Sequence, residues 1–218
     1  MTRTSRIALV AGAVGRRGEA LLNRVLGSGD YDGVVALADA PMALGMRALR
    51  LAALEALPPL ADAFILESAP EQASSRSFYG RDAPFVQVHP GNLLAIASAA
   101  VTQGARRMVL VSPMPGWQQV GAFHRGLGDA TELAVAQLPL ESLVVLRPTP
   151  DSGRAARNML ERVASIYVSL QLLMMPKSVQ SLTSEQLARA ALEAMRAATP
   201  GVKVIGADRI AELLGTPP

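Results

Sequence analysis

Three glycines near the start of the chain have the spacing of a phosphate-binding turn. Gly12, Gly15 and Gly18 follow the apolar run Ile7–Ala11 and precede a stretch with helical periodicity. In such a unit the first glycine permits a tight turn, the second lets the backbone approach a pyrophosphate, and the third lets the helix lie close to the strand. The helix N-terminus then offers N–H groups and a positive dipole end to the phosphates. The pattern predicts a dinucleotide site; the alternative is a glycine-rich turn without a ligand.

Asp39 is the second candidate, because it follows the apolar run Val34–Ala38 and lies 21 residues after Gly18. A carboxylate there accepts hydrogen bonds from the adenosine ribose and repels a 2′-phosphate, which favours NAD over NADP. Arg16 and Arg17 argue for NADP, since an arginine in this turn can reach a 2′-phosphate. The alternative for Asp39 is a turn residue at a strand end. The turn residues expected at the cofactor are Gly12, Val14, Gly15, Arg16, Arg17 and Gly18.

Few side chains could move a proton. The chain has no cysteine, which excludes disulfides, iron–sulfur clusters and thiolate chemistry, and its two histidines, His89 and His124, make a zinc site a poor expectation. His124 is the candidate general acid, because an imidazole can donate a proton near neutral pH, and Ser112 is a second candidate that could act with it. The alternative is that His124 is a polar residue without a chemical role. His89 precedes Pro90, which we expect to begin or kink a helix, so the predicted role of His89 is structural.

The elements that position these residues alternate between two periodicities. Helical spacing predicts helices over Gly18–Leu26, Leu93–Val101, Ala155–Met175, Thr183–Ala197 and Ala207–Leu214. Short apolar runs without polar alternation indicate parallel strands covered on both faces: Ile7–Ala11, Val34–Ala38, Ala63–Leu66, Met108–Val111, Leu143–Leu146 and Val202–Ile205. This alternation predicts an α/β fold, a doubly wound parallel sheet of Rossmann-like type. We expect one domain over residues 1–218, with a small helical C-terminal part.

Three stretches of the chain resemble a known family. The Gly12–Gly18 turn, the stretch Gly104–Ser112 and the stretch Leu143–Thr149, which contains Leu-Arg-Pro, are similar to atypical short-chain dehydrogenases/reductases of the NmrA-like or small epimerase-like branch. The resemblance runs from about Arg6 to Leu214. It implies NAD or NADP bound on a Rossmann fold, and some related regulators bind the cofactor without turning it over. It also implies that Ser68 and Pro148 lie at the cofactor.

The catalytic pair of that family is missing. Its members use a tyrosine and a lysine four residues later, which share one face of a helix. Here the residues four positions after Tyr31, Tyr79 and Tyr167 are Val35, Ala83 and Gln171. In the stretch that resembles the family's Tyr-x-x-x-Lys-x-x-x-Glu, His124 takes the tyrosine position, Gly128 the lysine position, and Glu132 the last position.

These observations predict a protein that binds a nicotinamide dinucleotide in a cofactor-dependent or regulatory role. One alternative is a divergent oxidoreductase with His124 as proton donor, acting on an unknown small molecule. Another is a non-enzymatic interaction scaffold, for which the apolar run Met159–Met175 suggests a homodimer. Scattered arginines and 4% aromatic residues argue against nucleic acid as a partner, and no segment has the pattern of a membrane span or a targeting signal. We therefore expect a cytoplasmic protein.

Overall fold

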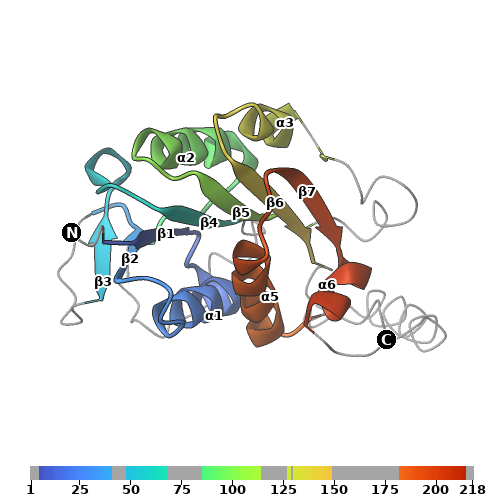
Figure 1. The fold of residues 1–218 in the computed structure, drawn as a ribbon. Coiled ribbons are helices and arrows are strands. Elements are labelled where there is room, and N and C mark those ends of the chain that lie inside the picture. Colours follow the sequence, from blue (N-terminus) through green and yellow to red (C-terminus); the bar gives the residue numbers. More distant parts are fainter. Residues whose placement is uncertain are drawn as a thin grey trace, which may run out of the picture.

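Seven parallel strands form the central sheet of the protein (Figure 1). The computed structural model describes residues 5–40, 48–67, 85–113, 127–128, 130–148 and 182–214, except the side chains of residues 208 and 211. The strand order is β3-β2-β1-β4-β5-β6-β7, and every neighbouring pair is parallel. The strands are β1 (Ile7–Ala11), β2 (Gly33–Leu37), β3 (Leu49–Ala52), β4 (Asp62–Leu66), β5 (Arg107–Val111), β6 (Ser142–Arg147) and β7 (Gly201–Gly206). This topology confirms the predicted doubly wound sheet.

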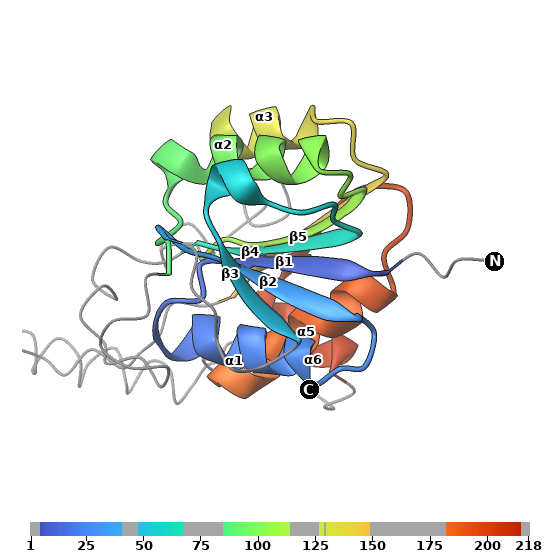
Figure 2. The same ribbon diagram turned by 90° about the vertical axis from the view of Figure 1, so that its left-hand side faces the viewer.

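Two layers of helices cover the sheet. Figure 2 shows α2 and α3 on one face, and α1, α5 and α6 on the other. The continuous apolar runs of the central strands are explained by this cover, because each strand must bury side chains on both faces. The helices are α1 (Gly15–Leu26), α2 (Pro90–Thr102), α3 (Ala130–Ala136), α5 (Ser184–Arg196) and α6 (Ala207–Leu213), and a short 3-10 helix spans Leu54–Ala56.

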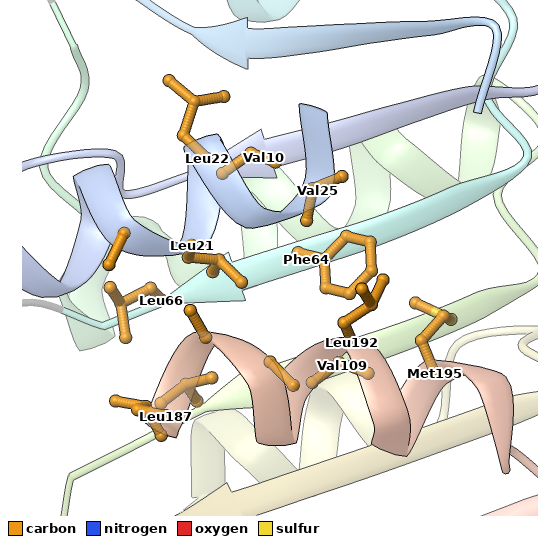
Figure 3. Close-up of a cluster of buried hydrophobic side chains, with 14 of the residues drawn as sticks. Val10, Leu21, Leu22, Val25, Phe64, Leu66, Val109, Leu187, Leu192 and Met195 are labelled. Atoms are coloured by element: carbon orange, nitrogen blue, oxygen red, sulfur yellow. The ribbon is translucent and has the colours of Figure 1, made fainter. Parts of the chain in front are cut away.

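The α1 and α5 helices pack side by side on the sheet (Figure 3). Leu21 and Val25 of α1 and Leu192 of α5 are buried, and they belong to one cluster with Phe64 of β4. Each such side chain contributes roughly 1.5–3 kcal/mol through removal of apolar surface from water. This packing fixes the start of α1, and with it the glycine turn, relative to the ends of β1 and β4.

The structure confirms the six predicted strands and corrects several boundaries. Helix α1 begins at Gly15 and α2 at Pro90, three residues before the expected starts, because the first turns lack the apolar periodicity on which the expectation was based. Strand β3 was not predicted; at the sheet edge its Arg50 is exposed between buried leucines, so the short run is not continuously apolar. The predicted helix Ala155–Met175 lies outside the described residues. In the described part of the chain, no helix is long and apolar enough to cross a membrane.

Candidate functional site

The glycine turn joins β1 to α1 at the carboxyl edge of the sheet. Gly12 has φ +83° and Gly15 has φ +69°, a backbone region that favours glycine. A Cβ atom on Gly12 would lie 2.0 Å from the carbonyl oxygen of Leu66, and one on Gly18 would lie 2.3 Å from that of Gly12. The turn therefore lies directly against the end of β4, and α1 lies directly against the turn. Glycine is required at both contacts.

The N-terminus of α1 has none of the usual stabilising side chains. Its N-cap residue is Val14, which makes no side-chain capping hydrogen bond, and the first turn contains no acidic residue. Instead it contains Arg16, which is exposed, and Arg17, which is buried. Basic residues at a helix N-terminus oppose the helix dipole, whereas an anion there is favourable. The backbone geometry and the charges of this turn fit the diphosphate of a dinucleotide.

Asp39 lies at the end of β2, on the same edge of the sheet. Its side chain is exposed, two residues after the last residue of the strand. Next to it, Ala38 forms an antiparallel bridge with Phe85, and the Val86 N–H donates to the Leu37 carbonyl at 3.1 Å. The predicted ribose residue therefore lies at the same edge of the sheet as the glycine turn, next to the residue that bridges to Phe85.

The segment 85–88 runs from β2 toward β4 and contacts the glycine turn. Val88 forms a parallel bridge with Glu67, and its methyl group Cγ2 would be 3.3 Å from a Cβ on Gly12. The half-buried Glu67 donates its N–H to the Val111 carbonyl at 2.9 Å. The sequence analysis assigned no role to this segment. It belongs to the site because it bridges to the residues that follow β2 and β4 and lies against the glycine turn.

The His89 side chain caps the N-terminus of helix α2. Its Nδ1 atom accepts from the Gly91 N–H at 3.1 Å, and Asn92 returns the contact by accepting from the His89 N–H at 2.9 Å. Pro90 is the first residue of the helix, so it begins α2 and does not kink it. The structural role predicted for His89 is confirmed.

Ser112 follows β5 and is 6% exposed. Arg147, the last residue of β6, donates from Nη1 to the Ser112 Oγ at 3.0 Å and forms a bidentate ion pair with Glu132 of α3. Pro148, which comes next, is buried. The Glu132–Arg147 pair was missed by the sequence analysis. A charged residue ending an apolar strand was the available signal, because a buried arginine needs a partner.

The tyrosine that the structure describes lies far from this edge. Tyr31 precedes β2 and donates to Asp62, the first residue of β4, at 2.9 Å. Burial, and then the Asp62 carboxylate, raise the pKa of the Tyr31 hydroxyl well above its ordinary value. It is therefore no proton donor for a site at the carboxyl edge. The candidate acid His124 and the predicted cofactor residue Ser68 lie outside the described residues, as do Tyr79 and Tyr167.

Comparisons with solved structures agree on the architecture. An oxidoreductase of the short-chain dehydrogenase/reductase family from Burkholderia thailandensis superposes with a TM-score of 0.52 and 18% identity, over 94% of this chain and 92% of that one. A short-chain dehydrogenase/reductase superfamily protein from Agrobacterium tumefaciens, solved with bound NAD, gives 0.51 and 16% identity, over 90% and 76%. The chain has a Rossmann-like fold. No protein-family model and no curated protein matches its sequence.

In a Rossmann-like fold the strand order reverses between β1 and β4, and ligands bind in the crevice outside the carboxyl ends of the strands at that point. The structure brings the glycine turn, Asp39 and Glu67 to the carboxyl edge of the sheet near this point, with Ser112 and Arg147 farther along the same edge. The turn after β1 offers backbone N–H groups that can bind phosphates. The ends of the neighbouring strands offer polar side chains.

Proposed function

We propose that this protein binds a nicotinamide dinucleotide at the turn between β1 and α1. The observation that carries the proposal is the N-terminus of α1, which combines two glycines pressed against backbone with a first turn that is basic and uncapped by a side chain. A diphosphate would bring negative charge to a helix end whose first turn contains no acidic residue. Gly12, Gly15 and Gly18 keep side chains out of its way.

The adenosine half lies toward β2, and NAD is the preferred cofactor. Asp39 is exposed at the end of β2, where its carboxylate can accept hydrogen bonds from the ribose hydroxyls and repel a 2′-phosphate. Arg16 is also exposed, but its contribution is to the charge at the diphosphate. A bound nicotinamide ring would supply a hydride acceptor or donor at the other half of the crevice.

The role we propose is cofactor-dependent binding or regulation rather than turnover. None of the three tyrosines is followed four residues later by a lysine, so the usual proton donor and its partner are absent from the sequence. Tyr31 is committed to Asp62 at the opposite edge of the sheet. Purified protein incubated with NADH and carbonyl compounds is therefore expected to show no sustained loss of absorbance at the nicotinamide band; sustained oxidation would contradict this role.

Fluorescence titration of the full chain with NADH and NADPH tests the binding. Saturable binding of NADH, tighter than that of NADPH, is expected, and no saturable binding of either would overturn the proposal. Asp39→Asn is expected to weaken NADH binding about tenfold and to reduce the preference over NADPH, because a charged acceptor becomes a neutral one.

The matched control is Asp32→Asn, at the other end of the same strand. Asp32 accepts a hydrogen bond from the Arg6 N–H at 2.8 Å, and asparagine keeps an acceptor oxygen for it. This variant removes the same charge from β2 without touching the carboxyl edge, so its nucleotide affinities are expected to equal those of the wild type. If the two variants change the nucleotide affinities equally, Asp39 does not contact the nucleotide.

A further inference from the structure

A buried ion pair lies at the carboxyl edge of the sheet, on the far side of β1 from Asp39. The side chains of Arg147 and Glu132 are 2% and 3% exposed, and both terminal nitrogens of the guanidinium contact the carboxylate. Removing two charges from water is unfavourable, and apolar side chains of similar volume often stabilise a protein as well or better. Stability alone is therefore a weak explanation for this pair.

The register of the sheet brings Arg147 and Ser112 together. Val111 pairs with Leu146, so Ser112 and Arg147 are the next residues along the two strands. Side chains alternate between the faces of a sheet. Met108 and Leu110 of β5 belong to the core beneath α2 and α3, and so do Leu143 and Val145 of β6. Ser112 and Arg147 continue this alternation toward the same layer, where Glu132 of α3 meets them.

The contact with Arg147 orients the Ser112 hydroxyl. Ser112 Oγ accepts from the guanidinium at 3.0 Å, so the hydroxyl proton is directed away from Arg147. A hydroxyl that already accepts a charged hydrogen bond is also a better donor, because adjacent hydrogen bonds polarise one another. The Ser112 hydroxyl is thereby oriented to donate a hydrogen bond to an acceptor on the side away from Arg147.

Glu132 also holds the chain before α3. Its Oε2 atom accepts from the Gly128 N–H at 2.5 Å, in addition to the two bonds from Arg147. One pair therefore fixes the end of β5, the end of β6 and the approach to α3. Rigid support of this kind is what a hydrogen-bonding group needs to hold a ligand in one orientation.

We infer that Glu132 and Arg147 are positioning residues that fix the Ser112 hydroxyl as a hydrogen-bond donor to the nicotinamide half of the dinucleotide. The inference rests on the proposed function. Asp39 lies on the β2 side of β1 and marks the adenosine half, so the other half of a dinucleotide crossing the crevice extends toward β4 and β5. Ser112 follows β5, so its hydroxyl would donate there to an oxygen acceptor of the nicotinamide half, the carboxamide.

The test compares the affinities for NADH and for ADP-ribose, which lacks the nicotinamide. Ser112→Ala is expected to weaken NADH binding about five- to tenfold and to leave ADP-ribose binding unchanged. The matched control is Ser142→Ala, which removes another buried hydroxyl at the opposite end of β6 and should change neither affinity. If Ser112→Ala leaves the ratio of the two affinities at the wild-type value, the inference is wrong although the proposed function stands. Absence of binding of both compounds by the wild type overturns both.

The positioning role is tested by removing both charges together. The double variant Glu132→Leu with Arg147→Met leaves no unpaired buried charge, and it is expected to lower the NADH affinity as much as Ser112→Ala does. Adding Ser112→Ala to it should cause no further loss, since both changes remove the same contact. A purely structural pair would give a folded double variant with the wild-type ratio of affinities, and that result would overturn the inference.

Arg147→Lys supplies the same comparison if the double variant does not fold. It keeps a positive partner for Glu132 but lacks the planar fork whose two separated nitrogens contact the carboxylate side-on while one of them also reaches Ser112. Weakened NADH binding with unchanged ADP-ribose binding is expected. Wild-type affinity for both compounds would contradict the positioning role.

Discussion

Asp62 shows how much a single buried residue can organise in this protein. Its carboxylate, 2% exposed, accepts from Arg107 at 2.6 and 2.8 Å, from Arg6 at 3.1 Å and from the Tyr31 hydroxyl at 2.9 Å. The hydrogen bond to Asp62 also raises the pKa of the Arg107 guanidinium above its ordinary value. The cluster ties the amino ends of β1, β4 and β5 together, at the edge opposite the candidate site.

Tyr31 makes the stability of the protein depend on pH in the alkaline range. Because its folded pKa is raised, the folded state keeps a proton that the unfolded chain releases above about pH 10. Its contribution is complete below that pH and declines as the pH rises further. Urea unfolding of the wild type should therefore show a loss of stability above pH 10 that is smaller in Tyr31→Phe. At pH 7 the variant should be less stable by about 1 kcal/mol, through the lost hydrogen bond. Identical slopes in the two proteins would contradict this assignment.

Gly18 is predicted to be intolerant of any side chain. An added Cβ would lie 2.3 Å from the Gly12 carbonyl oxygen and 2.5 Å from the Ala13 carbonyl carbon, both backbone atoms of the turn. Gly18→Ala is expected to lower the free energy of unfolding by about 2 kcal/mol or more and to displace the turn. At Gly33, whose nearest atom would be 3.8 Å away, alanine should change stability by less than about 1 kcal/mol. Urea denaturation of both variants measures the difference; equal stabilities would show that α1 is not pressed against the turn.

At the scale of the element, the basic first turn of α1 makes the helix less stable than an acidic first turn would. The helix has basic residues in its first turn and Arg24 in its last, so only the C-terminal arginine complements the dipole. Such an arrangement is expected where the N-terminus must hold an anion rather than stabilise itself.

Reversing the charge at each end of α1 should separate these effects. Arg16→Glu is expected to stabilise the protein by about 0.5–1 kcal/mol and to weaken NADH binding roughly tenfold at low salt. Arg24→Glu is the control; it should destabilise the helix by a similar amount and leave NADH binding unchanged. Thermal unfolding and NADH titration, each at low and at high salt, measure the two quantities. Unchanged affinity in Arg16→Glu would mean that the anion is not bound at this helix end.

At the scale of the whole molecule, the two edges of the sheet carry different kinds of residues. The Asp62 cluster stabilises the amino edge, and the glycine turn, Asp39 and Ser112 gather at the carboxyl edge. This division follows from the parallel sheet, since all strands end at the same edge.

Binding at the carboxyl edge should stabilise the entire fold. A ligand that binds only the folded state at a hundred times its Kd adds about 2.7 kcal/mol. For a chain of 218 residues this corresponds to a rise in Tm of roughly 5–10 °C. Differential scanning calorimetry with NADH at that concentration measures the rise. At the same NADH concentration, Asp39→Asn should show a smaller rise and Asp32→Asn an equal one; no rise in the wild type would contradict binding to the folded state.

The turn and the sheet were predictable because their signals are local. Gly12 to Gly18 lie within seven consecutive residues, and each central strand is a continuous apolar run. The edge strand β3 escaped prediction, since its Arg50 points to solvent. The Glu132–Arg147 pair escaped because its members are 15 residues apart in sequence and on different elements. The charged residue at the end of an apolar strand indicates that Arg147 needs a partner, but a single sequence does not say which acidic residue the partner is.

The amino-acid order alone determined six of the seven strands, the helices with a long apolar periodicity, and where the backbone can turn tightly, because these depend on neighbouring side chains. Only the tertiary structure decided which polar residues meet. The parallel register places Ser112 opposite Arg147, the α3 helix brings Glu132 to them, and the bridges of Phe85 and Val88 join the segment 85–88 to the residues that follow β2 and β4. Such contacts depend on packing between distant segments, so they exist only once the sheet and both helix layers have assembled.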